Sequence, residues 1–420
     1  MKLLWLELKK IAAQLRGSGK IFGYESTVAN QLYLLYCFAG HIYFTDKVHK
    51  RVKYFWYGIV SYQLLYSSVI SLEYLCLERK TDLMVKLHVL NFACMINTAA
   101  IIFPLIVYLC GDRIEALIQH VDDILMLDLG SGLKQKKIIA DAKKYFALYL
   151  IPSAISYLVL TFASVPDVVL FYEEEKLSNS LYYAFPPPLI QKYTSMWLYL
   201  IATGIIFIVY ALTLAQAWSS LGFVLYCSII VCVQLTSTKN FLRSRTRDLN
   251  VYTDDQVKHS ADWNGMFNCM LEHGILEFQQ VTRMINYLRK LFEGIGTMLV
   301  INGLWIGMIL LYTYLTNELL PVTKLKFLAG CMGTVIAVFL FYWAGQNLNN
   351  SVSEVTLAVY FTPWYRSVKV RKIVYIFLGQ TQSIKNFAVF KVHGMQLNNI
   401  ARYLHGQMSY THVLRKLTMK

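Results

Sequence analysis

The chain has 420 residues, of which 56% are hydrophobic and 15% charged, whereas soluble domains average roughly 45–50% and about 25%. This composition excludes an ordinary soluble domain and indicates an integral membrane protein. A net charge of +15 would also suit a nucleic-acid-binding protein, but the cations gather in alternate loops between apolar segments, which nucleic-acid binding does not require.

The first segment, MKLLWLELKK, carries no signal-peptide pattern, because Glu7 and Lys9 interrupt its apolar stretch and no small-residue cleavage site follows. Leu4, Leu8, Ile11 and Leu15 fall on one helical face. We predict a short amphipathic helix, which lies at the inner membrane interface or packs against the protein's own core.

Seven apolar segments follow, each long enough to cross about 30 Å of hydrocarbon, which takes about 20 helical residues. Most are rich in Tyr, Trp and Phe, as membrane interfaces favour. They lie near 53–77, 83–109, 144–166, 196–236, 291–317, 325–347 and, more weakly, 395–417. The sequence therefore predicts an all-α membrane protein with seven transmembrane helices.

The fourth apolar segment, 196–236, exceeds one simple span, since a helix of that length extends about 60 Å. Either one long helix continues beyond the membrane, or a hairpin breaks near Ser219, Ser220 and Gly222. The two alternatives place the next basic loop on opposite sides. We predict one long helix that projects into the cytosol.

The loop charges predict the orientation. Residues 1–53, 111–144, 239–290 and 366–372 hold 27 Lys and Arg residues, and the intervening loops hold nine. The positive-inside rule then places the N-terminus in the cytosol, and seven crossings place the C-terminus outside. The long segments 237–290 and 348–394 form a cytosolic anchor region in this topology.

The predicted segments follow from these boundaries: a cytosolic N-terminal segment, helices 1–4, a cytosolic helical loop, helices 5–6, a cytosolic anchor segment and helix 7. Their residue ranges are 1–52, 53–236, 237–290, 291–347, 348–394 and 395–420.

Other seven-helix proteins fit less well. G-protein-coupled receptors have an external N-terminus and commonly a disulfide at the second external loop, yet residues 167–195 hold no Cys. A transporter built from inverted repeats should show matched broken helices in two halves, and the chain shows none. Most cysteines lie in spans or cytosolic segments, so we predict free thiols. They are Cys37, Cys76, Cys94, Cys110, Cys227, Cys232, Cys269 and Cys331.

No motif predicts an enzyme, a cofactor or a metal site. Phosphate-binding and nucleophile-elbow motifs are absent. Cys269, Glu272 and His273 only loosely match metal-ligand spacing, and a polar stripe on an amphipathic helix explains them better. His405 and His412 share a helical side, which is more typical of helix packing than of metal binding.

A family resemblance lies in the last third of the chain. The segment FYWAGQNLNNSVSEVTLAVYFTPWY, Phe341 to Tyr365, resembles the link between the sixth and seventh helices of insect odorant receptors. The resemblance continues through Arg371, Lys372 and Gln382 to the final SYTHVLRKL, and more weakly through LEHGILEFQQVTRMINYLRKLFEGIG, where the family often has a His at the position of His273. A gustatory receptor of the same superfamily would end nearer TYxxxxxQF.

The resemblance implies an odorant-gated, non-selective cation channel in the plasma membrane of olfactory sensory neurons. It implies a tetramer whose seventh helices line the pore, and most tuned receptors of this family assemble with a shared co-receptor. The implied orientation agrees with the one that the loop charges predict.

Helix 7 carries the predicted pore stripe. At about 100° per residue, one face within about 100° holds Gly406, Ser409, Val413, Lys416, Leu417 and Lys420. By the resemblance, Val413 and Leu417 form a hydrophobic gate that blocks ions by dewetting. Lys416 either lines the outer mouth or extends to the external interface. Four such lysines would repel cations, so we predict a heterotetramer in which this chain is the minority subunit.

The resemblance places the odorant pocket in the outer half of the bundle, among helices 2, 3, 4 and 6. A volatile apolar ligand requires a mostly apolar cavity with a few polar groups. Each candidate also fits ordinary helix packing. The candidates are Leu87, Asn91, Ser153, Tyr157, Leu160, Trp197, Ile201, Phe327 and Cys331.

Overall fold

The structure is a computed structural model, and its described part is helical apart from one short hairpin. The hairpin pairs β1 (Ala388–Val389) with β2 (His393–Gly394) in antiparallel register. The described residues are 24–39, 50–72, 97, 101–127, 134, 136–145, 147, 148, 151, 155, 196–252, 261–316, 321–384, 388, 389, 393, 394 and 396–418. The predicted N-terminal amphipathic helix lies outside them.

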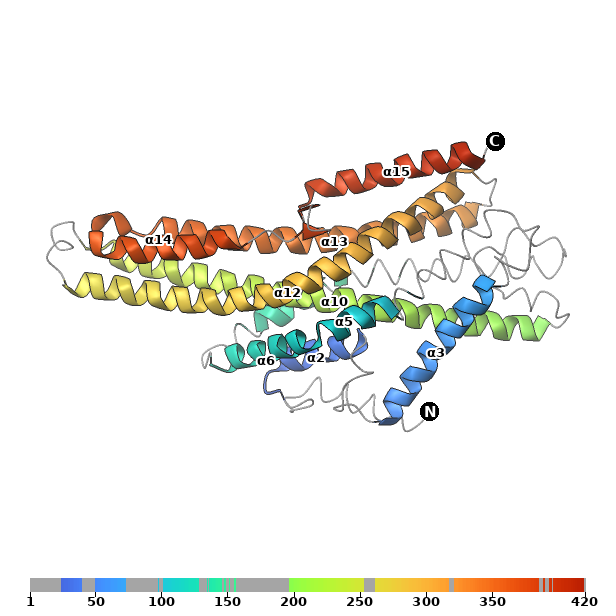
Figure 1. Ribbon diagram of the computed structural model, residues 1–420, viewed down its shortest axis with the longest axis horizontal. Helices are drawn as coiled ribbons and strands as arrows, with labels where there is room; N and C mark the ends of the chain where they lie inside the picture. The colour runs from blue at the N-terminus through green and yellow to red at the C-terminus, as the bar shows by residue number, and fades with distance from the viewer. Residues whose placement is uncertain are drawn as a thin grey trace.

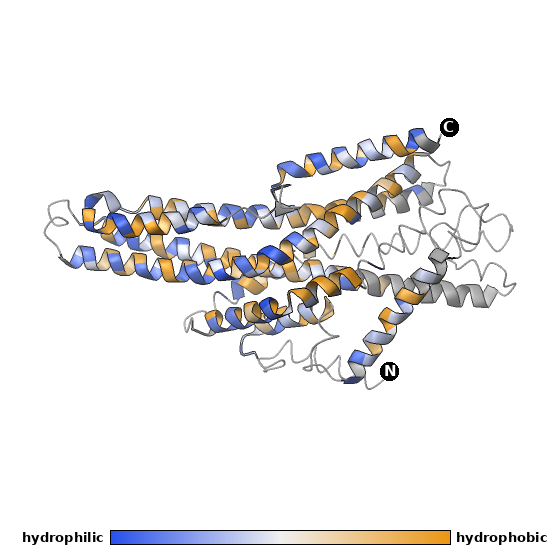
Figure 2. Cartoon of the chain, viewed as in Figure 1, coloured by the Kyte–Doolittle hydropathy of each residue, from blue (hydrophilic) through white to orange (hydrophobic). Residues whose placement is uncertain are grey.

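Three long helices run side by side along the molecule (Figure 1). They are α10 (Met196–Leu249), α12 (Ala261–Thr316) and α13 (Pro321–Tyr360), of 54, 56 and 40 residues. Within the described residues, these are the three helices that are long and apolar enough to cross a membrane. Hydrophobic residues dominate the C-terminal half of α12 and hydrophilic ones are more frequent toward its N-terminal end (Figure 2).

The fourth apolar segment is one uninterrupted helix, α10, so the prediction of a single long helix is confirmed and the hairpin is absent there. The serines that might have broken it bond to the preceding turn instead. Ser219 Oγ donates to the Ala215 carbonyl at 2.8 Å and Ser220 Oγ to the Gln216 carbonyl at 3.1 Å. Such back-bonding satisfies the hydroxyls inside a helix.

Three predicted segment boundaries, at residues 236, 290 and 347, fall inside continuous helices. Residues 261–290 of the predicted cytosolic loop and the fifth span form the single helix α12. Helix α10 continues past residue 236 to Leu249, and α13 continues past residue 347 to Tyr360. The reason is that the hydrophobic pattern changes along each helix while its backbone hydrogen bonding does not, so composition marks a change of surroundings and not a helix end.

The polar end of the bundle is closed by a reversal of the chain. After α13 the short helix η4 (Trp364–Arg366) leads into α14 (Val368–Ser383), which folds back against α12 and α13 (Figure 1). Phe377 of α14 packs edge-on against Phe278 of α12, with ring centroids 5.7 Å apart. Arg366 Nη1 donates to the Tyr252 carbonyl at 3.0 Å. These contacts make the compact helical region that the sequence assigned to an anchor.

Shorter helices pack against one side of the bundle: α2 (Thr27–Phe38), α5 (Phe103–Leu109) and α6 (Gly111–Leu127). Helix α3 (Lys50–Leu72) runs at an angle to them (Figure 1). Asp122 of α6 accepts hydrogen bonds from the backbone nitrogens of Glu25 and Ser26, at 2.9 and 2.7 Å, and so fixes the start of α2. Burial, and then the carboxylates of Glu115 and Asp122, raise the pKa of Tyr24 to about 12. The Tyr24 hydroxyl therefore stays protonated at physiological pH.

The described cysteines are free thiols, as predicted. They are Cys37, Cys110, Cys227, Cys232, Cys269 and Cys331, whereas Cys76 and Cys94 lie outside the described residues.

Candidate functional site

The last helix, α15 (Asn398–Thr418), lies along the outside of the bundle against the C-terminal half of α12 (Figure 1). One face of α15 is buried through residues four apart: Tyr403, Gln407 and Thr411. The opposite face is exposed, and the Val413 side chain retains 54% of its accessible surface. A helix of a membrane protein with one buried face and one open face is suited to line a shared interface or a pore.

The buried face of α15 sits on two glycines of α12, Gly303 and Gly307. Gln407 is 3% exposed, and its Nε2 donates to the Gly303 carbonyl at 3.0 Å and to Tyr403 Oη at 2.9 Å. A methyl group at Gly307 would overlap the Gln407 amide, and one at Gly303 would crowd the Tyr403 hydroxyl. Small residues four apart let helices approach closely, and here they expose a carbonyl to a polar side chain.

Gly307 also contacts α13. The Cys331 thiol lies 3.9 Å from the Gly307 carbonyl, and Thr334 Oγ1 donates to the Cys331 carbonyl at 2.8 Å. Gly307 is therefore in contact with α13 through its carbonyl and with α15 through its open Cα. Gly307 thus joins α12 to both of its neighbours at one point.

The structure places most of the predicted pore stripe on the open face of α15. Ser409, Val413 and Lys416 are exposed, and Gly406 is half-buried at the edge of the stripe near Leu304 of α12. For Leu417 the structure describes the backbone, which continues the helix. The stripe is thus turned away from the described core of its own chain.

The predicted odorant residues are described unevenly. Leu87, Asn91, Ser153, Tyr157 and Leu160 lie outside the described residues. Trp197 and Ile201 lie on α10 and Phe327 on α13, where the helix backbone is described. Cys331 is the member whose side chain is placed, and its thiol points to Gly307 of α12. The set as a whole stays a prediction.

The residues whose spacing loosely resembles that of metal ligands lie on α12 and α15. His273 Nε2 is 3.5 Å from Glu277 Oε1, and the His273 ring packs edge-on against Phe241 at 4.7 Å. His405 and His412 are exposed on α15. Among the described residues, no group of three or more His, Cys, Asp or Glu side chains is placed to hold a metal ion.

The sequence analysis did not predict that α15 packs on Gly303 and Gly307 of α12. The signal was present as Gly303 and Gly307, which form a small-x-x-x-small pattern within an apolar segment. It was also present as Tyr403, Gln407 and Thr411, polar residues at helical spacing on the side opposite the pore stripe. Neither pattern predicts which helix it packs against, because each indicates only that some helix packs there.

Gly307→Ala should lower the melting temperature of the purified receptor and alter gating. The added methyl group must displace Gln407 from the Gly303 carbonyl, and overpacking of this kind costs about 1–3 kcal/mol. The measurement is thermal unfolding, with odorant-evoked current as the second readout. Gly265→Ala is the matched control, because it lies on the same helix and its new Cβ would have open space. Equal melting temperatures for the two variants would contradict the close packing of Gln407 on Gly307.

These observations define a membrane protein of long helices in which α15 packs on Gly303 and Gly307 of α12 and leaves its other face exposed. A family model described as 7tm Odorant receptor matches residues 85–403. No curated protein sequence matches the chain. Because the family model covers most of the chain, the protein belongs to the odorant receptor family, whose members are odorant-gated ion channels and not enzymes.

Solved structures share this fold. The insect olfactory receptor OR5 from Machilis hrabei in complex with eugenol is 12% identical, with a TM-score of 0.71 over 93% of this chain and 97% of that one. Another structure of OR5 from Machilis hrabei is 11% identical, with a TM-score of 0.65 over 91% and 96%. At this identity the comparison establishes the fold of a multi-pass membrane protein.

Proposed function

We propose that the chain is the odorant-binding subunit of a ligand-gated, non-selective cation channel, assembled with a shared co-receptor in the plasma membrane of olfactory sensory neurons. The observation that carries the proposal is the open face of α15. It holds Ser409, Val413 and Lys416, and it is exposed while the opposite face is buried on α12. One helix cannot enclose a pore, so neighbouring subunits must supply the remaining wall.

The ligand of this channel is a small, largely apolar odorant. OR5 from Machilis hrabei has been solved in complex with the small odorant eugenol. In this chain the candidate pocket includes Phe327 and Cys331 of α13 together with Trp197 and Ile201 of α10. The contact of Cys331 with Gly307 offers a direct route from such a pocket to the helix that carries the gate.

Recording from cells that express the chain with and without a co-receptor, against an odorant panel, tests this function. We expect odorant-evoked cation current when both subunits are present. Flux of a substrate without a conductance would instead favour a transporter. A response that requires G proteins would favour a G-protein-coupled receptor, and activation by non-volatile tastants alone would favour a gustatory receptor.

The proposed orientation predicts a simple staining result. An epitope tag after Lys420 should be stained on intact cells, and a tag before Met1 only after permeabilisation, because 27 loop cations lie on the predicted cytosolic side. Immunofluorescence on unpermeabilised and permeabilised cells measures this. The reverse pattern would contradict the orientation and return the G-protein-coupled class to consideration.

A further inference from the structure

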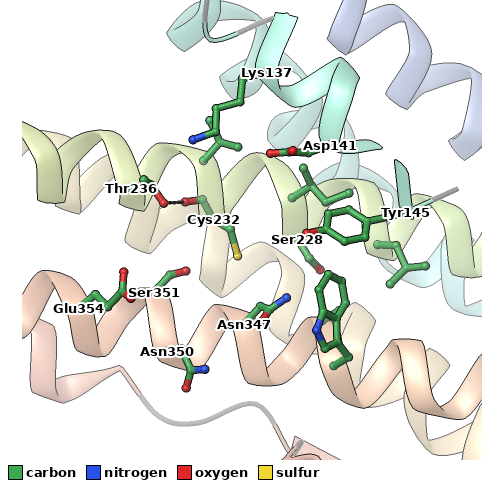
Figure 3. A pocket seen from close by; sticks show the side chains of 15 residues that line it. Lys137, Asp141, Tyr145, Ser228, Cys232, Thr236, Asn347, Asn350, Ser351 and Glu354 are labelled. Carbon is green, nitrogen blue, oxygen red and sulfur yellow. Dashed lines mark hydrogen bonds between the residues drawn. The ribbon is translucent and has the colours of Figure 1, made fainter. Parts of the chain in front are cut away.

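A polar cleft of about 270 Å³, lined by no residue of α15, lies where α10, α13 and the helical residues 136–145 meet (Figure 3). Ser228, Cys232 and Thr236 of α10 form its floor. Its two walls meet at one end, where the rings of Tyr145 and Trp343 pack with centroids 4.5 Å apart. The other end is open.

The cleft lies at the level where its three helices change from apolar to polar. On α13, Ala344 lies within the apolar run and Asn347 and Asn350 follow it. On α10, Thr236 is followed by Lys239. Such a change, with Trp and Tyr at the boundary, marks the interface between hydrocarbon and water. The cleft is therefore within reach of lipid headgroups.

Charges of both signs face this cleft from one helical segment. Lys137 and Asp141 lie one turn apart, a spacing of about 5–6 Å between Cβ atoms. Among the residues that the structure describes, neither forms an ion pair. Glu354 also lines the cleft, but Lys239 neutralises it at 2.7 Å. The charges open to a ligand are thus one ammonium and one carboxylate.

Neutral groups complete the recognition surface. The Asn347 side chain is half-buried and directed into the cleft, and it has no hydrogen-bond partner within the described part of the chain (Figure 3). The closed end is formed by the aromatic rings of Tyr145 and Trp343, and aromatic rings attract cations. The volume is near the lower end of the range for small-ligand pockets, about 300–1,000 Å³, so it suits a headgroup-sized molecule.

The exposed face of the same segment continues toward apolar side chains. Beyond Asp141 on this segment, Leu148 and Ile155 are also helical. Leu148 and Ile155 are exposed by more than half. A molecule with a charged head in the cleft could therefore lay an acyl chain along this face.

We propose that the cleft binds a phosphate–ammonium zwitterion of the kind that phosphatidylethanolamine presents at the membrane surface. Lys137 holds the phosphate, Asp141 holds the ammonium group, and Asn347 donates to a phosphate or ester oxygen. Basic pockets between transmembrane helices bind anionic headgroups. Here the added carboxylate selects a zwitterion, because an anionic headgroup would leave Asp141 facing a like charge.

The test is direct binding to the full-length receptor purified in detergent, so it does not depend on whether the chain conducts ions. The probes are short-chain phosphatidylethanolamine, short-chain phosphatidylglycerol, which lacks the ammonium group, and glycerophosphoethanolamine, which lacks the acyl chains. We expect the ethanolamine lipid to bind at least about tenfold more tightly than the glycerol lipid. We expect Lys137→Gln, Asp141→Asn and Asn347→Leu each to weaken its binding by about tenfold.

Matched controls are Lys144→Gln and Asp123→Asn, exposed charges outside the cleft, which should leave binding unchanged. Melting temperatures without lipid identify any variant that fails to fold. If glycerophosphoethanolamine binds as tightly as the lipid, the zwitterion comes from solution; if it binds much more weakly, the membrane supplies it. Equal binding of the two lipids, or unchanged binding by all three folded cleft variants, overturns the proposal.

Discussion

Val413→Ser should make the assembled channel conduct without odorant. A hydrophobic constriction blocks ions because water leaves it, and a hydroxyl at the narrowest ring keeps it wet. Val413 is 54% exposed on α15, so the substitution leaves the packing of the chain's own core intact. The measurement is resting current in cells that express the variant with the co-receptor. Leu417→Ser is expected to act in the same direction, because it lies one turn further along the same stripe.

Met408→Ser is the matched control for the gate. Met408 is also exposed on α15, at 48%, but it lies about 140° around the helix from Val413. The same loss of apolar surface there should leave the resting current unchanged. A Val413→Ser channel that reaches the cell surface and shows an ordinary resting current would remove Val413 from the gate.

The chain alone should give no odorant-evoked current, and current should appear when the co-receptor is added. The reason is Lys416, which is exposed on the same stripe as Val413. In a tetramer of identical chains, ammonium groups about 8 Å apart at an effective dielectric near 20 would repel by about 2 kcal/mol per pair before salt screening. Such a ring would also repel permeating cations. A single Lys416 among neutral partners avoids both effects.

Lys416→Gln tests the same argument within the heteromer. Cation conductance or divalent permeability should rise while odorant sensitivity stays largely unchanged, because Lys416 is not among the candidate pocket residues. Arg415→Gln removes the same charge about 100° away and should have the smaller effect. Single-channel recordings and reversal potentials measure both variants. Robust odorant-gated current from the chain alone would refute the obligate heteromer. If Lys416→Gln changes neither conductance nor divalent permeability, the lysine lies at the external interface and not in the pore.

Several features follow from the sequence alone. The hydrophobic content establishes a membrane protein, and the segment from Phe341 to Tyr365 points to the family that the family comparison then showed. The continuity of α10 was also predictable, since Ser219 and Ser220 can bond to their own helix. These features are local, in that each depends on composition or on hydrogen bonds within one segment.

Membrane boundaries and helix boundaries proved to be different quantities. Residues 290 and 347 lie inside α12 and α13, because a helix continues wherever its backbone bonds continue, whatever surrounds its side chains. Periodicity on α15 predicted the stripe of Val413 but not the packing of the Gln407 face on α12. It could not say which face is buried, because both carry polar residues.

Tertiary structure alone decided which segments meet. Gln407 finds the Gly303 carbonyl only because α15 returns along α12 more than a hundred positions later in the chain. Lys137 and Asn347 line one cleft although they are further still apart in sequence. In a membrane protein, apolar periodicity marks lipid-facing and protein-facing sides alike, so the sequence ranks no pairing above another. Close packing against specific glycines and polar groups makes that choice, and those contacts appear only when the helices are assembled.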